Sequence, residues 1–206
     1  EVKMVYLLVF LPLLGSIIAG FWGRRLGDKL SLYLTSSLLL ISMTLSWITF
    51  WQLSSNHVDK IYPLMEWMNV GDFNIVWSLR HDMLSAVMMI VITTVSAMVH
   101  IYSIGYMSHD NSKPRFMSYL SLFTFAMLML VTSDNLIQLF FGWEGVGLAS
   151  YLLIGFWYHK PSAHTAAMKA FIVNRVGDFG FILGIIATYS VFGSLYFDEI
   201  FSDIEG

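Results

Sequence analysis

Long apolar runs separated by short polar stretches dominate the chain of 206 residues. Six of the runs reach the length of roughly 20 residues that a helix needs to cross the hydrocarbon core of a bilayer. Membrane-spanning barrel strands are shorter, about 9–11 residues, and they alternate between apolar and polar positions. The pattern therefore predicts an all-α integral membrane protein with a single membrane domain, 1–206. Its helices are expected at about 5–23, 30–52, 83–107, 116–132, 135–157 and 168–193.

The connection 53–82, between the second and third runs, is longer than the others. It contains Pro63 and a stretch, 73–79, in which apolar and polar residues alternate. Such alternation is typical of a half-buried strand. The connection is therefore predicted to form either a short hairpin or an amphipathic cap outside the membrane, and no residue in it belongs to a recognisable catalytic motif.

Composition supports the membrane assignment and excludes several functions. Hydrophobic residues make up 57% of the chain and charged residues 12%, against about 25% charged residues in soluble domains. The net charge of −3 and the lack of a basic stripe argue against nucleic acid as a partner. The absence of cysteine excludes disulfides and thiolate-bound Fe–S clusters. Because no phosphate-binding loop or dinucleotide motif is visible either, we expect this chain to bind no cofactor or metal.

Basic residues are concentrated in the odd-numbered connections between the apolar runs. Cytoplasmic connections of membrane proteins carry an excess of Lys and Arg. The first, third and fifth connections are therefore predicted to face the cytoplasm or the mitochondrial matrix, with both termini on the opposite side. The basic residues of these three connections are Arg24, Arg25, Lys29, Lys113, Arg115 and Lys160, whereas Lys3, Lys60 and Arg80 lie on the other side.

Glu144 is the most unusual residue of the chain, because it lies near the middle of the fifth apolar run. An ionised carboxylate at the bilayer centre costs at least a few kcal/mol, so such residues usually bind or conduct something. The cargo that best suits a carboxyl group is a proton. The alternative is a structural glutamate that is hydrogen-bonded to a neighbouring helix. The surrounding glycines fit that alternative as well, because small residues let membrane helices approach closely.

Four further polar residues lie in the apolar runs, and a fifth lies in a turn. Arg175 and Asp178 are three positions apart and share a helix face, so they are either a mutually neutralising structural pair or a functional one. His100 is either a proton shuttle or a hydrogen-bonding partner between helices. Lys169 lies close enough to a helix end to extend its ammonium group to the membrane surface. Asp134 is expected to cap the fifth helix.

The sequence around Glu144 resembles a known family. It is similar to the signature of the distal antiporter-like membrane subunit of respiratory complex I, which is subunit L of bacterial NADH:quinone oxidoreductase and chain 5 in mitochondria. The stretches 100–107, 133–136 and 166–178 fit the same family, so the resemblance covers essentially the whole chain. The most specific part of the motif begins Phe141-Gly142-Trp143-Glu144-Gly145-Val146-Gly147-Leu148.

The resemblance implies a subunit that translocates protons, driven by redox chemistry elsewhere in complex I. It implies that Glu144 is the membrane glutamate that pairs with a lysine on a later, broken helix. It also implies that Arg175 and Asp178 are the charged pair associated with coupling, whereas Lys169 and His100 match family positions without a definite role. NADH, FMN, Fe–S clusters and quinone are expected in partner subunits. The membrane is expected to be the bacterial inner membrane, or the mitochondrial inner membrane for an organellar protein.

The chain is shorter than the family pattern. Family members carry two inverted five-helix repeats, whereas about six apolar runs are visible here. We therefore expect an N-terminal fragment that forms the first part of an antiporter-like helical bundle. Two other functions remain open at this point. One is a subunit of a multi-subunit Mrp-type cation/proton antiporter, although the residues of the glutamate motif favour the respiratory subunit. The other is a non-conducting assembly fragment.

Overall fold

The computed structural model describes residues 2–56, 59–71 and 73–205. Six of its helices are long and apolar enough to cross a membrane, which confirms the predicted fold class. The helices are α1 (Val2–Leu26), α2 (Asp28–Asn56), α3 (Met83–Tyr106), α4 (Lys113–Val131), α5 (Leu136–Ile154), α6 (Pro161–Phe192) and the short α7 (Phe197–Glu205), and the strands are β1 (Lys60–Val70) and β2 (Phe73–His81).

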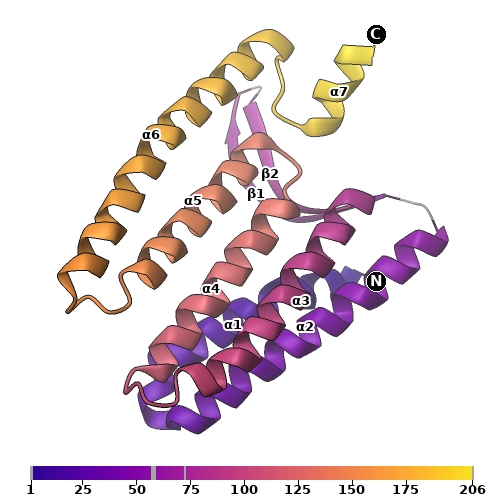
Figure 1. Ribbon diagram of the computed structural model, residues 1–206. Coiled ribbons are helices and arrows are strands. Elements are labelled where there is room, and N and C mark those ends of the chain that lie inside the picture. Colours follow the sequence, from indigo (N-terminus) through magenta and orange to yellow (C-terminus); the bar gives the residue numbers. More distant parts are fainter. Residues whose placement is uncertain (1, 57–58, 72, 206) are drawn as a thin grey trace.

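Helices α1 to α4 form a four-helix group, and α5 and α6 extend it on the side of α4 (Figure 1). α5 packs extensively against α4, whereas α6 packs mainly against α5. As a result, much of the surface of α6 is exposed. The two helices that carry Glu144, Arg175 and Asp178 therefore lie at the margin of the structure rather than in its centre.

The connection 53–82 contains an antiparallel hairpin, the first of its two predicted forms. β1 pairs with β2, and Gly71 adopts a positive φ of 62° in the turn. Pro63 lies in β1 beside a register shift, as expected for a residue that cannot donate to the ladder. Ile75 and Leu79 are buried, so one face of β2 contributes to the apolar core at this end of the bundle.

Most helix boundaries differ by a few residues from the prediction based on apolar runs, and two of the differences have a clear local cause. α6 begins at Pro161, well before position 168, because proline suits the first helical position and polar residues can extend a helix beyond the hydrocarbon core. α5 ends at Ile154 with Gly155 as its C-cap, whereas the apolar run continues to 157. Hydropathy thus located the helices, but local backbone chemistry fixed where they begin and end.

Hydroxyl groups link the helices inside the four-helix group. Ser46 and Thr93 lie 2.8 Å apart across the α2–α3 interface. The Ser118 hydroxyl donates to the carbonyl oxygen of Ser16 at 2.8 Å, and the Ser42 hydroxyl donates to that of Leu8. In a membrane such groups need partners within the protein. These contacts therefore fix the helix packing and need no transport function.

We predict that Gly142→Ala destabilises the contact between α4 and α5. A Cβ atom at this position would lie 2.6 Å from Cα and 2.7 Å from the backbone nitrogen of Leu130. The helix backbones would have to separate, and overpacking of this kind costs roughly 1–3 kcal/mol. Thermal unfolding of the purified protein measures the effect. Gly177→Ala is the matched control, because a Cβ atom there meets no described atom within 4 Å; equal melting temperatures for the two variants would contradict the prediction.

Candidate functional site

One arginine is shared by two carboxylates across the α5–α6 interface. Nη1 of Arg175 lies 2.6 Å from Oε1 of Glu144 and 3.6 Å from Oδ2 of Asp178. Arg175 and Asp178 were expected to be either a mutually neutralising pair or a functional one, and the shorter contact of the arginine is with Glu144. With all three groups ionised, the cluster carries one excess negative charge. Uptake of one proton would therefore make it neutral.

The local sequence explains how the two helices bring these groups together. Arg175 and Asp178 point to the same side of α6 because they are three residues apart. The two helices lie within van der Waals reach of each other here, since a Cβ atom at Gly147 on α5 would lie at an ordinary contact distance of 3.5 Å from Nδ2 of Asn174 on α6. The charged groups therefore meet through a close contact between two helix faces.

Trp143 holds the second carboxylate of the cluster. Its indole Nε1 donates to Oδ1 of Asp178 at 2.9 Å, which leaves the other carboxylate oxygen facing Arg175. The only sequence signal for this role of Trp143 is its position beside Glu144. Glu144, Asp178, Arg175 and Trp143 thus form one polar cluster, which we call the α5–α6 cluster.

The α5–α6 cluster is open on one side. The side chain of Asp178 is 8% exposed, that of Glu144 24% and that of Arg175 50%. A half-exposed guanidinium group at membrane depth requires water or other polar groups around it. The exposed side of the cluster is thus suited to exchange protons with water or with another polar group, whereas Asp178 is the fixed and buried member.

His100 lies apart from the α5–α6 cluster, between α3 and α4. Its side chain is fully buried; Nδ1 lies 2.8 Å from the carbonyl oxygen of Ser96, and Nε2 lies 3.0 Å from the hydroxyl of Ser121. The first contact requires Nδ1 to donate, so that Nε2 accepts from Ser121. This geometry is that of a hydrogen-bonding partner between helices, which was one of the two roles considered for His100.

Lys169 is exposed on α6 and makes no ion pair with another described residue. Since α6 begins at Pro161, Lys169 lies about two turns inside the helix. The structure therefore does not bring Lys169 into the α5–α6 cluster.

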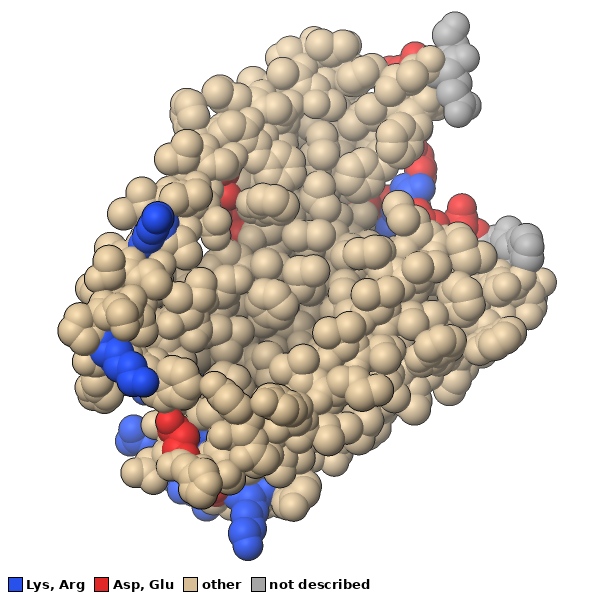
Figure 2. All heavy atoms as spheres, in the orientation of Figure 1, with Lys and Arg blue, Asp and Glu red and all other residues tan. Residues whose placement is uncertain are grey.

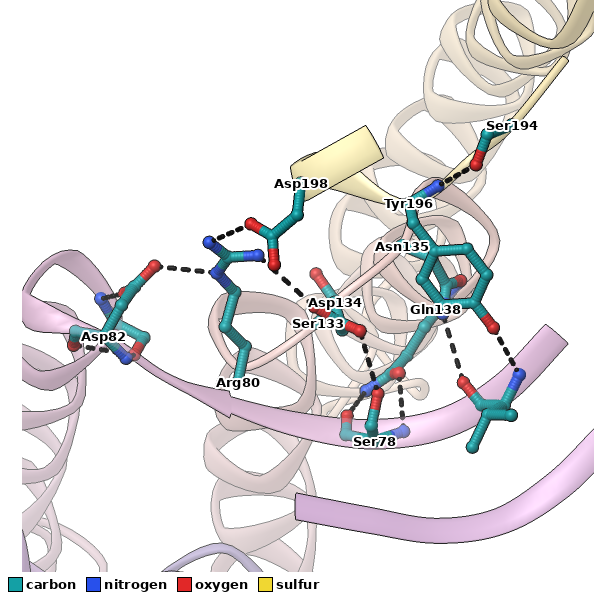
Figure 3. A network of polar contacts seen from close by, with 12 residues as sticks. Ser78, Arg80, Asp82, Ser133, Asp134, Asn135, Gln138, Ser194, Tyr196 and Asp198 are labelled. Atoms are coloured by element: carbon teal, nitrogen blue, oxygen red, sulfur yellow. Dashed lines mark hydrogen bonds and ion pairs between the residues drawn. The ribbon is translucent and has the colours of Figure 1, made fainter. Parts of the chain in front are cut away.

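A second charged network surrounds Arg80 of β2 (Figure 3). The guanidinium nitrogens of Arg80 lie 2.8 Å from a carboxylate oxygen of Asp82, 3.3 Å from one of Asp134 and 2.7 Å from one of Asp198. These carboxylates come from the N-cap of α3, the α4–α5 turn and α7. One guanidinium group thus ties the hairpin to three other segments, and sequence spacing alone gave no sign of this.

The prediction that Asp134 caps α5 was wrong. The N-cap is Asn135, whose side-chain oxygen accepts from the backbone N–H of Gln138 at 2.9 Å. Asp134 instead accepts from Arg80 and, at 3.3 Å, from the hydroxyl of Ser78. Gln138 is fully buried and bonds to both backbone groups of Ser78, so the first turn of α5 is attached to β2.

The carboxylates around Arg80 differ in their environments. Burial raises the pKa of Asp134 above its usual value, and the nearby charge of Arg80 opposes this only in part. Burial also raises the pKa of Asp82, but hydrogen bonds from Ser85 and Arg80 outweigh it and leave the pKa below its usual value of 3.8. Burial disfavours the charge on Arg80, yet Asp82 and Asp198 raise its pKa overall. This network is therefore a structural clamp that favours the charged arginine.

No group of three or more His, Asp or Glu side chains in the described part of the chain forms a metal-binding arrangement.

Comparison with known proteins agrees with this fold. A model of the "NADH-Ubiquinone oxidoreductase (complex I), chain 5 N-terminus" family matches residues 67–117. A model described as "NADH:quinone oxidoreductase/Mrp antiporter, TM" matches residues 133–205. The class of protein is thus the antiporter-like membrane subunit. Within this class, the chain belongs to the subunit L (chain 5) family of NADH:quinone oxidoreductase.

Curated relatives support the same family. Subunit L of NADH-quinone oxidoreductase from Rhodobacter capsulatus is 52% identical over 97% of this chain, which covers 29% of that protein. Chain 5 of NADH-ubiquinone oxidoreductase from Chondrus crispus and from Arabidopsis thaliana is 50% identical over 97% of this chain. The chain spans about 30% of the length of these two relatives.

Two solved structures share the fold. An archaeal membrane-bound sulfane sulfur reductase has a chain with a TM-score of 0.78 and 18% identity, covering 95% of this chain and 39% of its own. The Mrp complex of Dietzia sp. has a chain with a TM-score of 0.79 and 22% identity, covering 95% of this chain and 20% of its own. At these identities the likeness supports the antiporter-like fold alone.

Proposed function

We propose that this protein is part of a proton-translocating membrane subunit of NADH:quinone oxidoreductase, in which it helps to couple quinone reduction to proton pumping. The observation that carries the proposal is the α5–α6 cluster, where one arginine serves two carboxylates inside the membrane region. The relatives named above, which are subunits of an NADH-quinone oxidoreductase, support the choice of complex.

In this function Glu144 is the proton acceptor and Arg175 is the movable charge. While Glu144 is ionised, Arg175 lies 2.6 Å from it. Protonation of Glu144 removes that attraction, and the guanidinium group then moves toward Asp178, which Trp143 holds in place. A cation that approached Glu144 from the exposed side would favour the ionised carboxylate and so promote release of its proton. Proton binding and arginine position are therefore linked, which is the requirement for a coupled transfer step.

The redox chemistry is assigned to partner subunits. NADH, FMN, Fe–S clusters and quinone are bound there, while this chain contributes ionisable groups within the membrane. Other membrane subunits of complex I are its neighbours. We infer the bacterial inner membrane or the mitochondrial inner membrane as its location, and relatives from a bacterium and a plant support this inference.

The runner-up is a subunit of an Mrp-type cation/proton antiporter, which the shared fold favours. Vesicles that contain the assembled complex separate the two functions, with internal pH followed by a dye. Redox-driven pumping predicts acidification on addition of NADH that stops when quinone reduction is inhibited. Proton movement driven by a sodium gradient without NADH would instead favour the antiporter. If neither stimulus moves protons, the chain has only an assembly role.

We predict that Asp178→Asn impairs NADH-driven pumping less than Glu144→Gln does. Asparagine retains an oxygen that accepts from Trp143, and Glu144 keeps its contact with Arg175. Only one charge of the cluster is lost, and the proton acceptor remains. Initial pumping rates in the same vesicles, normalised to assembled complex, measure the difference. A loss equal to or greater than that of Glu144→Gln would show that Asp178 is the principal acceptor.

A further inference from the structure

A small pocket lies at the end of the molecule where the α1–α2, α3–α4 and α5–α6 turns gather. Basic side chains are concentrated at this end (Figure 2). The pocket has a volume of about 170 Å³ and opens between α4, the end of α5 and the first turns of α6. Polar and aromatic side chains form much of its wall: Arg115, Tyr119, Tyr151, Phe156, Tyr158 and His164.

Arg115 is the one Lys or Arg among the residues that line this pocket, and its guanidinium group makes a single hydrogen bond to the described part of the chain. Nη2 donates to the carbonyl oxygen of Phe156 at 3.1 Å. Nε is buried and has no hydrogen-bond partner in the described part of the chain. The guanidinium carbon lies 4.7 Å from the centre of the Phe156 ring and 5.4 Å from that of Tyr158. The aromatic rings thus fix the group in place without neutralising its charge.

No carboxylate among the described residues lies within ion-pairing distance of Arg115. Asp110, on the preceding turn, instead accepts from the indole of Trp157 at 2.9 Å and from the backbone N–H of Ser112 at 2.7 Å. The N-terminal turns of α6 border the pocket and add the positive end of a helix dipole. Arg115 therefore brings a guanidinium cation to the pocket, and the charge of Asp110 is near enough to interact with it without forming an ion pair.

We propose that this pocket binds a phosphate group, carried either by an anionic membrane lipid or by a soluble phosphate. A guanidinium fork matches two phosphate oxygens, and bonds of this kind are stronger than those between neutral groups. Basic pockets between helices on the cytoplasmic or matrix side suit lipid headgroups. Tyrosine hydroxyls and His164 provide further donors around the same space.

A bound phosphate would join α4, α5 and α6 at one end. Among the described residues, α6 packs mainly against α5. The proposed site thus steadies the helix that carries Arg175 and Asp178, at a distance from the α5–α6 cluster. It does not depend on the function proposed for that cluster.

Binding is tested on the protein purified with its accompanying membrane subunits and depleted of lipid by detergent exchange. Radiolabelled lysophosphatidylglycerol and inorganic phosphate are titrated separately onto the wild type, Arg115→Gln and Arg115→Lys. Lys160→Gln is the matched control, because it removes a nearby cation that lies over the Trp157 ring and does not line the pocket. Arg115→Lys keeps the charge and the packing of the stem, so it reports on binding even if Arg115→Gln fails to assemble.

We expect the wild type and Lys160→Gln to bind the ligand at a saturable site. Arg115→Gln should lack this site, and Arg115→Lys should bind the ligand at least about threefold more weakly than the wild type. Binding of the lysolipid without competition by inorganic phosphate identifies a membrane lipid as the source. Competition by inorganic phosphate identifies a site open to soluble anions. The proposal is overturned if the wild type binds neither ligand, if both Arg115 variants bind like the wild type, or if Lys160→Gln loses as much binding as Arg115→Gln.

Discussion

Glu144→Gln is expected to reduce NADH-driven proton pumping by at least about tenfold while the complex remains assembled, in line with the usual contribution of a positioned proton-transfer group. Glutamine has nearly the same size and still accepts a hydrogen bond from Arg175, so the α5–α6 contact persists. It cannot take up a proton, and the attraction that links proton binding to the position of Arg175 is lost. The measurement is the initial rate of dye quenching in vesicles, together with the rate of quinone reduction.

Glu66→Gln is the matched control for this variant. Glu66 is an exposed acid in β1, outside the membrane-spanning helices. The complex with Glu66→Gln should therefore pump protons like the wild type. Native gels establish that both variants assemble to the same extent. Normal pumping by assembled Glu144→Gln would remove Glu144 from the mechanism.

Arg80→Gln is expected to lower the free energy of unfolding by about 2–4 kcal/mol. Loss of one partner from a buried ion pair costs about 3–5 kcal/mol, and the exposure of Asp198, 59%, reduces that figure. Three carboxylates would then lie close together without their shared cation. We expect a lower melting temperature and faster proteolysis near α7, because α7 is attached through Asp198. Arg80→Lys keeps the positive charge, so its free energy of unfolding should fall by less than that of Arg80→Gln.

The pH dependence of Arg80→Gln provides a second test with a definite sign. In the wild type the pKa of Asp82 lies below its unfolded value of 3.8. Its contribution to stability is therefore present above pH 3.8 and is lost as the pH falls further. The pKa of Asp134 already lies above its usual value in the wild type, and without Arg80 repulsion among the carboxylates raises their folded-state pKa values further. The variant should then gain stability on mild acidification from neutral pH. A melting temperature and a pH dependence of stability equal to those of the wild type would contradict the role of Arg80 as a structural clamp.

Much of the fold follows directly from the sequence. Six runs long enough to span a bilayer lead to six helices, because a membrane leaves few alternatives for an apolar backbone. Alternation in 73–79 indicated a strand, and β2 is one. Helix ends were less predictable, as Pro161 and Gly155 show, because they depend on backbone preferences that hydropathy does not record.

The candidate site divides in a similar way. Glu144, Arg175 and Asp178 are visible in the sequence because a charge inside an apolar run is rare and costly. Their pairing was not visible, since the partner of Arg175 at 2.6 Å is on another helix. Trp143 and Arg80 were missed because aromatic and exposed-looking basic residues are common, and only their neighbours in space give them a role.

The sequence by itself determined the membrane environment, the number of spanning helices, the family motif and the costly charges, because each depends on residues close together in the chain. Tertiary structure decided which charges meet, which residue of the hairpin is paired with α7, and which arginine has no carboxylate partner among the described residues. These depend on contacts between segments far apart in the chain. A single arginine can face several carboxylates or none, and only the packing of helices determines which.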